Sequence, residues 1–471
     1  MSNQTPAAAP AAEEVSTLYA KRRKIFARSV RGLFDNWRIA LVVLTQAIFY
    51  GGLWLEWNGR QALLFHLVER KFYLFGLVFW PQDVIYLAIL LIVSAYALFL
   101  VTAIGGRLFC GYACPQTVYT EIFMWIENWV EGDRAARMKL DKAPWSVRKL
   151  RPRAAKHALW LALSLWTGFT LVGYFTPVKE LVAALPTFSF GGWEIFWIFF
   201  YGGLTYLMAG FMREQVCKYM CPYARFQSVM FDPDTLIVTY DRERGEPRGA
   251  RRKSAAAAAQ KNLGECVDCN ICVQVCPTGI DIRDGLQYEC IGCAACIDAC
   301  DQVMDKMAFP RGLVRYSTEN ALNHHLSRRE VLRHIVRPRI LGYGAVLVVI
   351  VGIAGWFLAH RIPLKVDIIR DRAVLAREAD DGSIENAFLL QFMNTDEKPH
   401  RYRIAVTGLD GVKIVGAAEV DVAAATFTSQ PLLLQAAPDA GRQGSNPIRF
   451  EIEAIDDPGI RVAEKAAFIL P

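Results

Sequence analysis

The stretch CVDCNICVQVCP, residues 266–277, decides how the middle of this 471-residue chain folds. A second stretch, CIGCAACIDACD at residues 290–301, repeats its C-x2-C-x2-C-x3-C spacing. This doubled spacing is typical of bacterial ferredoxins with two [4Fe-4S] clusters, in which three thiolates come from one run and the fourth from the other. The pattern therefore predicts two clusters with crossed ligands. The first would be held by Cys266, Cys269, Cys272 and Cys300, and the second by Cys276, Cys290, Cys293 and Cys296.

Two other uses of these cysteines fit the spacing less well. Structural zinc prefers two separated C-x2-C pairs, and a disulfide framework is typical of a small secreted domain. One feature departs from the ferredoxin pattern, because Pro277 follows Cys276 whereas Asp301 follows Cys300. The second run is therefore expected to turn differently or to lie nearer solvent, without the loss of a ligand.

The other four cysteines form two copies of one hexapeptide. CGYACP spans residues 110–115, CKYMCP spans residues 217–222, and each copy follows an apolar stretch. This parallel internal repeat places both pairs at one depth, and the proline after each second cysteine disfavours a helical conformation there. We expect each pair, Cys110 with Cys114 and Cys217 with Cys221, at a helix end. Thiolates favour Cu(I), zinc or iron–sulfur iron, and the alternative is small buried residues at a helix turn.

Five apolar stretches reach the roughly 17–25 residues that a membrane-spanning helix needs. They lie at residues 39–55, 84–104, 157–175, 191–211 and 340–359. They predict a membrane domain at 39–230, a region at 231–339 with a ferredoxin module at about 262–305, and a fifth transmembrane helix at 340–359. Residues 72–80 are too short to cross and are expected to lie at the interface or to re-enter.

The net charge of +7 is distributed as in a bacterial inner-membrane protein. Basic residues crowd the N-terminal segment 1–38 and residues 134–156, whereas the loop between the third and fourth apolar stretches carries only Lys179. By the positive-inside rule, the N-terminus, the 105–156 loop and the 212–339 segment are expected in the cytoplasm and residues after 360 in the periplasm. All twelve cysteines then lie where thiols stay reduced. This charge pattern gives no support to nucleic-acid binding.

Residues 361–471 change to a period of two and contain no cysteine. Short strands are expected at 364–371, 387–393, 401–407, 412–415, 448–454 and 463–470. Such a series fits an immunoglobulin-like β-sandwich. Because it has no evident catalytic cluster, we interpret this region as a binding or assembly domain.

Motifs for other redox cofactors are missing from the sequence. The seven histidines all lie outside the middle of the apolar stretches, and the chain has no C-x-x-C-H, G-x-G-x-x-G or P-loop motif. The sequence therefore gives no sign of a membrane-crossing haem relay or a nicotinamide fold. Electrons are expected to arrive and leave on the cytoplasmic side.

The order of these features resembles one known family. FCGYACPQTVYTEIFMWIENWVEGDR (109–134), VCKYMCPYARFQSVMFD (216–232), the double ferredoxin run, a last span and a β-rich tail are similar to the cytochrome c oxidase accessory proteins of the CcoG/FixG/RdxA type. The resemblance implies a role in assembling the cbb3-type oxidase, by reduction of Cu(II) to Cu(I) before copper passes to a transporter or chaperone. It also implies that the candidate catalytic and copper-binding residues are the C-x3-C-P cysteines Cys110, Cys114, Cys217 and Cys221. The eight ferredoxin cysteines match the family's cluster ligands.

Three functions stay open at this point. The first is a membrane-bound cupric reductase, an oxidoreductase. The second is a quinol-linked electron-transfer subunit without copper chemistry, resembling the NapH/NosR group, and the third is an assembly scaffold whose clusters sense redox state. The sequence does not decide between a cytoplasmic and a quinol electron donor. Membrane lipid is an expected partner. The sequence does not decide copper stoichiometry, whether both C-x3-C-P pairs form one site, homodimer formation or the partner of the C-terminal domain.

Overall fold

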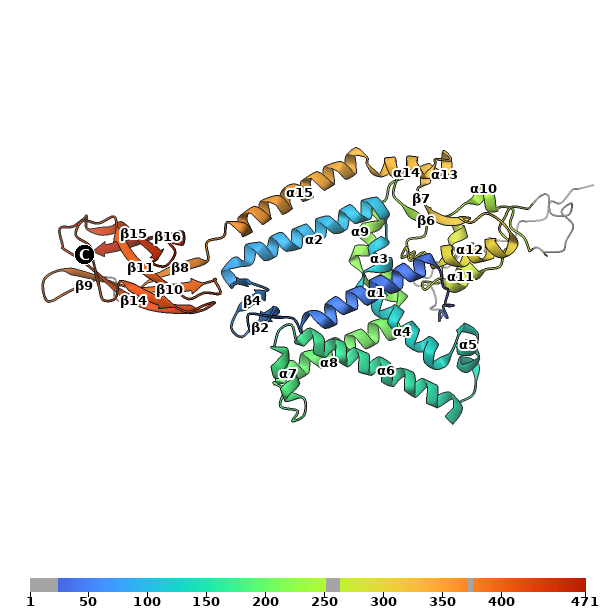
Figure 1. Ribbon diagram of the computed structural model, residues 1–471, viewed down its shortest axis with the longest axis horizontal. Helices are drawn as coiled ribbons and strands as arrows, with labels where there is room; N and C mark the ends of the chain where they lie inside the picture. Colours follow the sequence, from blue (N-terminus) through green and yellow to red (C-terminus); the bar gives the residue numbers. More distant parts are fainter. Residues whose placement is uncertain (1–23, 251–262, 372–375) are drawn as a thin grey trace, which may run out of the picture.

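The computed structural model describes residues 24–250, 263–371 and 376–471. Three regions follow one another along the long axis (Figure 1). The cysteine-rich region lies at one end, a group of long helices lies in the middle, and a β-sandwich lies at the opposite end. All twelve cysteines belong to the first region or to the adjacent ends of the helices.

The middle region consists of long helices that correspond to the predicted apolar stretches. They are α1 (Leu33–Gly52), α2 (Val84–Gly105), α6 (Val147–Val172), α8 (Gly192–Leu207) and α15 (Pro338–Ala359), with α8 continued by the π-helical turn η2 (Met208–Met212). Helix α6 contacts α8, and α15 contacts α2. Shorter helices, α4 (Pro115–Glu131) and α5 (Arg134–Lys142), connect α2 to α6 at the cysteine-rich end.

Three helices in the described part of the chain are long and apolar enough to cross a bilayer: Pro81–Gly105, Gly192–Met212 and Pro338–Ala359. The other two predicted spans begin with charged turns. Helix α1 carries Asp35 and Arg38 near its start, and α6 begins with the basic sequence VRKLRPR at residues 147–153. Their apolar parts are correspondingly shorter, so an arrangement with five spans stays a prediction.

At the far end of the helices, residues 53–83 form two small antiparallel sheets. One pairs β1 (Glu56–Trp57) with β2 (Arg60–Gln61), and the other has the order β3 (Leu63–His66), β4 (Lys71–Leu74), β5 (Leu77–Phe79). Residues 72–80, which were expected to lie at the interface or to re-enter, form the β4–β5 hairpin, and their depth in a membrane stays a prediction. Phe75 has φ 53°, so the chain reverses there and the two apolar arms satisfy each other's backbone hydrogen bonds.

These sheets hold the β-sandwich in place through charged contacts. Asp83, in the 3-10 turn before α2, is buried and binds Arg361 at 2.5 Å and also Lys365. Glu397 of the sandwich accepts hydrogen bonds from Asn58 and Arg60. The turn before α2 and the start of the C-terminal region are therefore fixed to one another.

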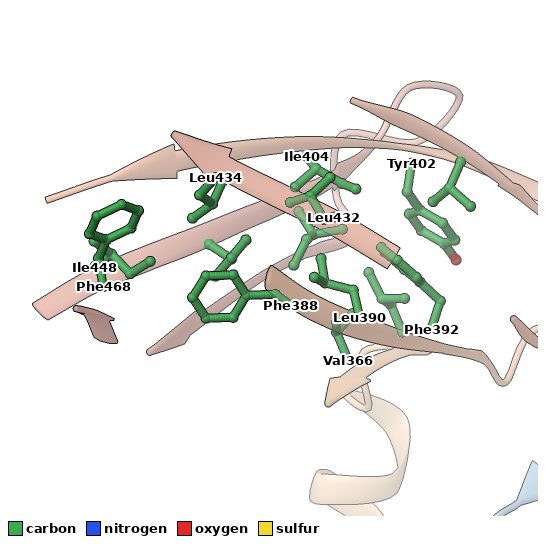
Figure 2. Close-up of a cluster of buried hydrophobic side chains, with 14 of the residues drawn as sticks. Val366, Phe388, Leu390, Phe392, Tyr402, Ile404, Leu432, Leu434, Ile448 and Phe468 are labelled. Carbon is green, nitrogen blue, oxygen red and sulfur yellow. The ribbon is translucent and has the colours of Figure 1, made fainter. Parts of the chain in front are cut away.

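The C-terminal region is a two-sheet sandwich. Its strands are β8 (Leu364–Arg370), β9 (Arg377–Glu378), β10 (Ile384–Asn394), β11 (His400–Thr407), β12 (Lys413–Val415), β13 (Glu419–Val422), β14 (Phe427–Ala436), β15 (Gly444–Ala454) and β16 (Arg461–Leu470). One sheet has the order β12-β14-β10-β8, with β9 on β10, and the other has the order β13-β11-β15-β16. Aromatic and aliphatic side chains from both inner faces, such as Phe388, Phe392 and Tyr402, fill the space between them (Figure 2).

All six predicted strands are present. The two-residue strand β9 was missed, and so were β13 and β14. Their sequence, EVDVAAATFTSQPLLLQA at residues 419–436, contains three adjacent alanines and Pro431, which weaken a strand signal. In the structure Pro431 lies beyond the last pair between β12 and β14, Val415 with Leu433. No strand flanks it on that side, so its missing N–H breaks no hydrogen bond there.

The cysteine-rich region is a ferredoxin-like unit closed by two strands. β6 (Ile237–Tyr240) pairs antiparallel with β7 (Val314–Ser317), and between them in the chain lie α10 (Arg242–Gly245), α11 (Ile271–Val275), η5 (Ile282–Asp284) and α12 (Ala295–Met307). Both strands lie outside the predicted bounds of about 262–305. They complete the unit because Val238, Leu313 and Val314 bury their side chains beneath α12. Two helices, α13 (Glu319–Asn323) and α14 (Arg328–Ile335), then lead to α15.

Candidate functional site

The eight ferredoxin cysteines line two neighbouring cavities. Cys266, Cys269, Cys272 and Cys300 line the first. Cys276, Cys290, Cys293 and Cys296 line the second, which Cys272 also borders. Apart from the shared Cys272, each cavity therefore receives three cysteines from one run and one from the other. Four thiolates around a cavity with mostly apolar walls fit a [4Fe-4S] cluster, and this grouping is compatible with crossed ligands.

Both cysteine runs turn in the same way, at equivalent positions. In the first run Asp268 has φ 52° and Asn270 has φ 55°, and in the second run Gly292 has φ 67° and Ala294 has φ 59°. These left-handed residues reverse the chain twice within each run, so that successive thiols face one centre. Asp, Asn and Gly tolerate this conformation more readily than other residues. A helix begins directly afterwards in each run, α11 and α12.

The two cavities differ in their exposure to solvent. Cys269 of the first cavity is exposed, whereas Cys293 of the second cavity is buried at 8% exposure. Burial raises the pKa of the Cys290 thiol to about 12, and burial likewise raises the pKa of Cys300 to about 12. Such thiols become thiolates at neutral pH only when a metal replaces the proton, which fits cluster ligands.

The two C-x3-C-P pairs have matching local structure. Cys110 lies on the short helix α3 (Leu108–Tyr112), and Cys114 is the N-cap of α4. In the second copy Cys217 lies on the π-helical turn η3 (Val216–Met220), and Cys221 is the N-cap of α9 (Pro222–Met230). The proline after each second cysteine occupies the first turn of the new helix, where its missing N–H costs nothing. Each pair therefore bridges the junction between two helices.

Glutamine side chains hold the two pairs together. The Gln116 amide, at the start of α4, donates to the carbonyl oxygens of Met208 at 3.0 Å and Arg213 at 3.2 Å, in the segment before the second pair. In the opposite direction the fully buried Gln227 of α9 donates to the Gly106 carbonyl at 2.8 Å, just before the first pair. These reciprocal bonds fix the two copies of the repeat against each other.

The two C-x3-C-P pairs affect each other's ionisation. Burial, together with the negative charges of Cys114, Cys217 and Cys221, raises the pKa of the Cys110 thiol to about 12, against the opposing charge of Arg107. Burial and the charge of Cys114 also raise the pKa of Cys217 to about 11. The Cys110 thiol donates to the Gln227 side-chain oxygen at 3.5 Å. Cys110 and Cys217 are therefore shielded from solvent, and both lie against one apolar core.

This four-cysteine site lies directly against the second cavity. Cys110 and Cys217 contact the small apolar core that contains Cys293. A methyl group on Gly111 would lie 2.9 Å from the carbonyl oxygens of both Ile291 and Gly292. Only a residue without a side chain permits this approach of α3 to the second cysteine run.

Arg107 reinforces the same contact. Its buried guanidinium donates to the carbonyl oxygens of Cys290 at 3.2 Å and Tyr288 in the second run, and of Ala224 in α9 at 3.1 Å. The sequence analysis missed Arg107, Gly111 and Gln227. The only signal was their nearness in sequence to the cysteines, which does not show what they contact.

No group of three or more His, Cys, Asp or Glu side chains within residues 24–250, 263–371 and 376–471 converges as ligands of a single metal ion. A cubane needs no such convergence, because its four thiolates bind four different iron atoms and stand further apart. The lack of a convergent ligand group is more informative for the C-x3-C-P cysteines than for the cluster ligands. Their arrangement is not a closed site for a single copper ion.

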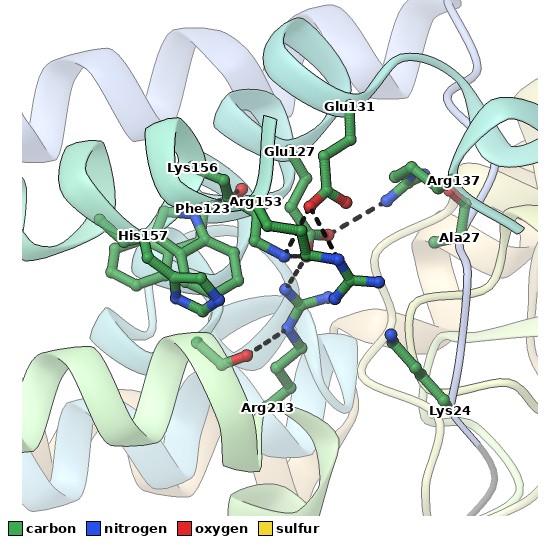
Figure 3. Close-up of polar contacts among 12 residues, drawn as sticks. Lys24, Ala27, Phe123, Glu127, Glu131, Arg137, Arg153, Lys156, His157 and Arg213 are labelled. Atoms are coloured by element: carbon green, nitrogen blue, oxygen red, sulfur yellow. Dashed lines mark hydrogen bonds and ion pairs between the residues drawn. The ribbon is translucent and has the colours of Figure 1, made fainter. Parts of the chain in front are cut away.

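A buried ion-pair network supports the second pair (Figure 3). Glu127 of α4 contacts Arg213 at 2.7 Å, Arg137 at 3.1 Å and Lys156 at 3.6 Å, and Glu131 contacts Lys156 at 2.9 Å. Burial alone would raise the pKa of Glu127, but Arg213 and Lys156 hold it below its usual range. The network fixes the start of the segment that carries Cys217.

Together, the ferredoxin-like unit, the two four-cysteine cavities and the apolar helices define an iron–sulfur electron-transfer protein associated with a membrane. Family models agree with each part. A 4Fe-4S dicluster domain matches residues 212–319 and a 4Fe-4S binding domain matches residues 87–139. A model described as the IG-like fold at the C-terminal of FixG matches residues 354–471.

Two curated relatives cover most of the chain. The nitrogen fixation protein FixG of Rhizobium meliloti is 39% identical over 448 residues, which are 88% of this chain and 85% of the relative. Protein RdxA of Cereibacter sphaeroides is 38% identical over 476 residues, covering 96% and 98%. This chain belongs to the FixG/RdxA family, as its motifs suggested. A crystal structure of a FixG-related protein from Vibrio parahaemolyticus aligns with 23% of this chain and 95% of its own, at 25% identity and a TM-score of 0.21.

Proposed function

We propose that this chain carries electrons from two [4Fe-4S] clusters to Cu(II) at the four C-x3-C-P cysteines, and that the resulting Cu(I) serves assembly of a cbb3-type cytochrome c oxidase. The observation that carries this proposal is the contact between the two sites. Cys110 and Cys217 share an apolar core with Cys293, and Gly111 lies against the backbone of Ile291 and Gly292. An electron would need to cross only this packed boundary.

The cluster ligands in this proposal are the crossed sets. Cys266, Cys269, Cys272 and Cys300 hold the first cluster, and Cys276, Cys290, Cys293 and Cys296 hold the second. When bound, each cluster supplies a one-electron carrier. The exposed Cys269 faces solvent, whereas the buried Cys293 adjoins the C-x3-C-P site. The apolar core that Cys110 and Cys217 share with Cys293 would exclude water between the second cluster and bound copper.

Copper is the substrate in this reaction. One Cu(II) gains one electron and becomes Cu(I), and no other bond is made or broken outside its ligand shell. Thiolates are soft ligands that favour Cu(I), so the four cysteines favour the reduced product. Their raised pKa values mean that copper binding releases protons. Copper transporters or chaperones and oxidase assembly factors are the proposed partners.

We further propose that the chain lies in a bacterial inner membrane with five spans, its N-terminus in the cytoplasm and its sandwich in the periplasm. The charge bias of the loops supports this orientation, since the basic segment 134–156 lies at the cysteine-rich end of the helices. The test of this orientation does not depend on the cysteines or on bound metal. A reporter enzyme that functions only in the periplasm should be active when it is fused after Pro471. If a reporter that functions only in the cytoplasm is active at this position instead, the orientation is the reverse.

The function is tested by anaerobic copper reduction, followed with a Cu(I)-specific chelator. Cys110→Ala and Cys217→Ala, singly and together, should abolish Cu(II) reduction by the prereduced protein and leave its iron content unchanged. Ser228→Ala, an exposed change on α9, should behave as the wild type. Undiminished copper reduction in the double variant would show that copper is reduced elsewhere.

A second candidate is a quinol-linked electron-transfer subunit without copper chemistry, similar to the NapH/NosR group. The observation in its favour is that no single-ion site has formed among the described residues. On this alternative, the protein would pass electrons to another redox protein and copper would not oxidise its clusters. Mixing the reduced protein with stoichiometric Cu(II) and following cluster absorbance separates the two functions.

A further inference from the structure

A buried group of three charged side chains, the Arg38 triad, lies where the helices meet the ferredoxin-like unit. Arg38 of α1 contacts Asp35 on the preceding turn at 3.2 Å and Glu121 of α4 at 3.0 Å. The side chains of all three residues are at most 10% exposed. Glu121 also accepts the indole N–H of Trp125 at 2.9 Å. Because an unpaired buried charge is costly, these contacts fix the position of the guanidinium.

The Arg38 triad adjoins the second cysteine set. Arg38 and Glu121 both line two cavities whose other walls include chain neighbours of the cluster ligands. These neighbours are Val275 and Pro277 beside Cys276, Ile291 beside Cys290, and Ala295 beside Cys296. Cys217 of the C-x3-C-P site lines the second of these cavities as well. The triad therefore borders the segments that carry three ligands of the second cluster.

The charges of the triad act on the second cysteine set. Burial raises the pKa of the Cys293 thiol, the positive charge of Arg38 opposes this effect, and the negative charge of Glu121 adds to it more weakly. An opposite charge nearby favours the charged form of a group, and a like charge disfavours it. Negative charge at this position is therefore stabilised by Arg38 more than it is destabilised by Glu121.

The first cysteine set has a similar arginine in a more exposed place. Arg283 lines the first cavity and contacts Asp268 and Asp281, each at 2.6 Å. These two carboxylates are 45% and 22% exposed, whereas both carboxylates of the Arg38 triad are buried. Charges interact more strongly where water is excluded. Arg38 should therefore influence its cluster more than Arg283 influences the first one.

We propose that Arg38 raises the reduction potential of the second cluster, so that electrons pass from the first cluster to the second. Reduction adds one electron, and hence one negative charge, while the first cluster loses that electron and no bond forms or breaks. Net charge near a cluster is one of the factors that set its potential. The buried guanidinium stabilises the reduced form, and the Glu121 carboxylate destabilises it.

The source of this charge links the potential to docking. Arg38 and Glu121 belong to α1 and α4, not to the ferredoxin-like unit. The second cluster therefore has the raised potential only when the unit is docked on the helices. This inference rests on the two clusters of the proposed function, but it does not rest on copper.

The test is a redox titration of the full-length protein, purified anaerobically in detergent and followed by EPR. The wild type should show two midpoints. Arg38→Gln should make reduction at one midpoint at least tenfold less favourable, which is about 59 mV for one electron. Arg38→Lys keeps the charge and should stay within threefold of the wild type. Glu121→Gln removes a negative charge, keeps an acceptor for Trp125, and should shift the same midpoint in the opposite direction.

Two further arginines serve as controls. Arg283→Gln is the matched substitution at the first cavity and should shift the other midpoint by less than tenfold. Arg401→Gln removes an exposed ion pair of the sandwich and should shift neither midpoint. If Arg38→Gln loses iron, the direction of the shift in Glu121→Gln decides the question.

Any of four results would overturn the proposal. The two clusters of the wild type titrate at one potential, or Glu121→Gln leaves both midpoints unchanged, or Arg38→Gln and Glu121→Gln shift a midpoint in the same direction, or Arg38→Lys shifts it as far as Arg38→Gln does. The last two would mean that packing, and not charge, sets the potential. The titration contains no copper, so a failure of the proposed copper reduction and a failure of the role of Arg38 are separate observations.

Discussion

The contact between α3 and the second cysteine run makes Gly111→Ala the most informative single substitution. The added methyl group would lie 2.9 Å from two backbone carbonyl oxygens, those of Ile291 and Gly292, and 3.0 Å from the Cys293 amide nitrogen. Ordinary van der Waals contact begins at 3.4 Å, so the two segments must separate by about 0.5 Å or deform. All three atoms belong to the backbone, and no side chain can rotate away.

Overpacking of this kind costs about 1–3 kcal/mol. The cost should fall on the docking of the C-x3-C-P site against the second cluster, because the contact joins those two parts. We expect a lower thermal midpoint, an altered EPR spectrum of the second cluster and slower electron transfer to copper. The iron content should stay at that of the wild type, since no cysteine is changed.

The assay compares the purified, anaerobically prepared variant with Gly203→Ala, whose added methyl group on α8 would meet nothing within 4 Å. Thermal unfolding, EPR of the dithionite-reduced protein and single-turnover oxidation by Cu(II) are measured on both. If Gly111→Ala matches Gly203→Ala in all three measurements, the two sites are not in the contact described and the proposed electron path is wrong.

Three further expectations follow from the site and the sandwich. The purified protein should contain about eight iron atoms per chain, four for each of two cubanes; about twelve would place a third cluster on the C-x3-C-P cysteines. Glu127→Gln removes the carboxylate shared by Arg137, Lys156 and Arg213 and should lower the unfolding free energy by about 3–5 kcal/mol, measured against the exposed Glu243→Gln. Because the folded pKa of Glu127 lies below its usual value of 4.5, its stabilising contribution should be complete above that value and be lost as the pH falls through the lowered one. Phe450→Ala, at a fully buried position of the sandwich, should destabilise that domain by about 3–5 kcal/mol. The iron content and copper reduction should stay unchanged. Loss of iron would contradict the independence of the cluster sites from the sandwich.

Local patterns in the sequence predicted the parts of the structure that depend on neighbouring residues. The crossed grouping expected from the cysteine spacing is compatible with the lining of the two cavities. The C-x3-C-P repeats lie at helix junctions because Pro115 and Pro222 each start a helix. Period-two alternation located six of the sandwich strands. In each case the physical cause acts within a few residues, so these features can be predicted from the sequence without the tertiary structure.

Packing between distant segments was not predictable in this way. The contact of Gly111 with Gly292 joins residues far apart in sequence, and a glycine beside a cysteine gives no sign of what approaches it. Helix α4 is amphipathic, yet its Glu127 is buried among basic residues from other segments. An acidic residue on an amphipathic helix is usually solvated, so only the fold shows that this one is paired.

The ferredoxin-like unit is docked on the helices rather than tethered to them, and this bears on how electrons would move. Asp298 of α12, between two cysteines, accepts the backbone N–H groups of Phe34 at 3.2 Å and Asp35 at 2.8 Å, and so caps the N-terminus of α1. A carboxylate in this position is stabilised by the helix dipole. Together with Arg107 and Gly111, it joins the cluster-bearing segments to the helices at three separate places. Because electron transfer depends steeply on distance, these three contacts would hold the proposed electron path at a fixed length. Each contact can be loosened separately to test that dependence.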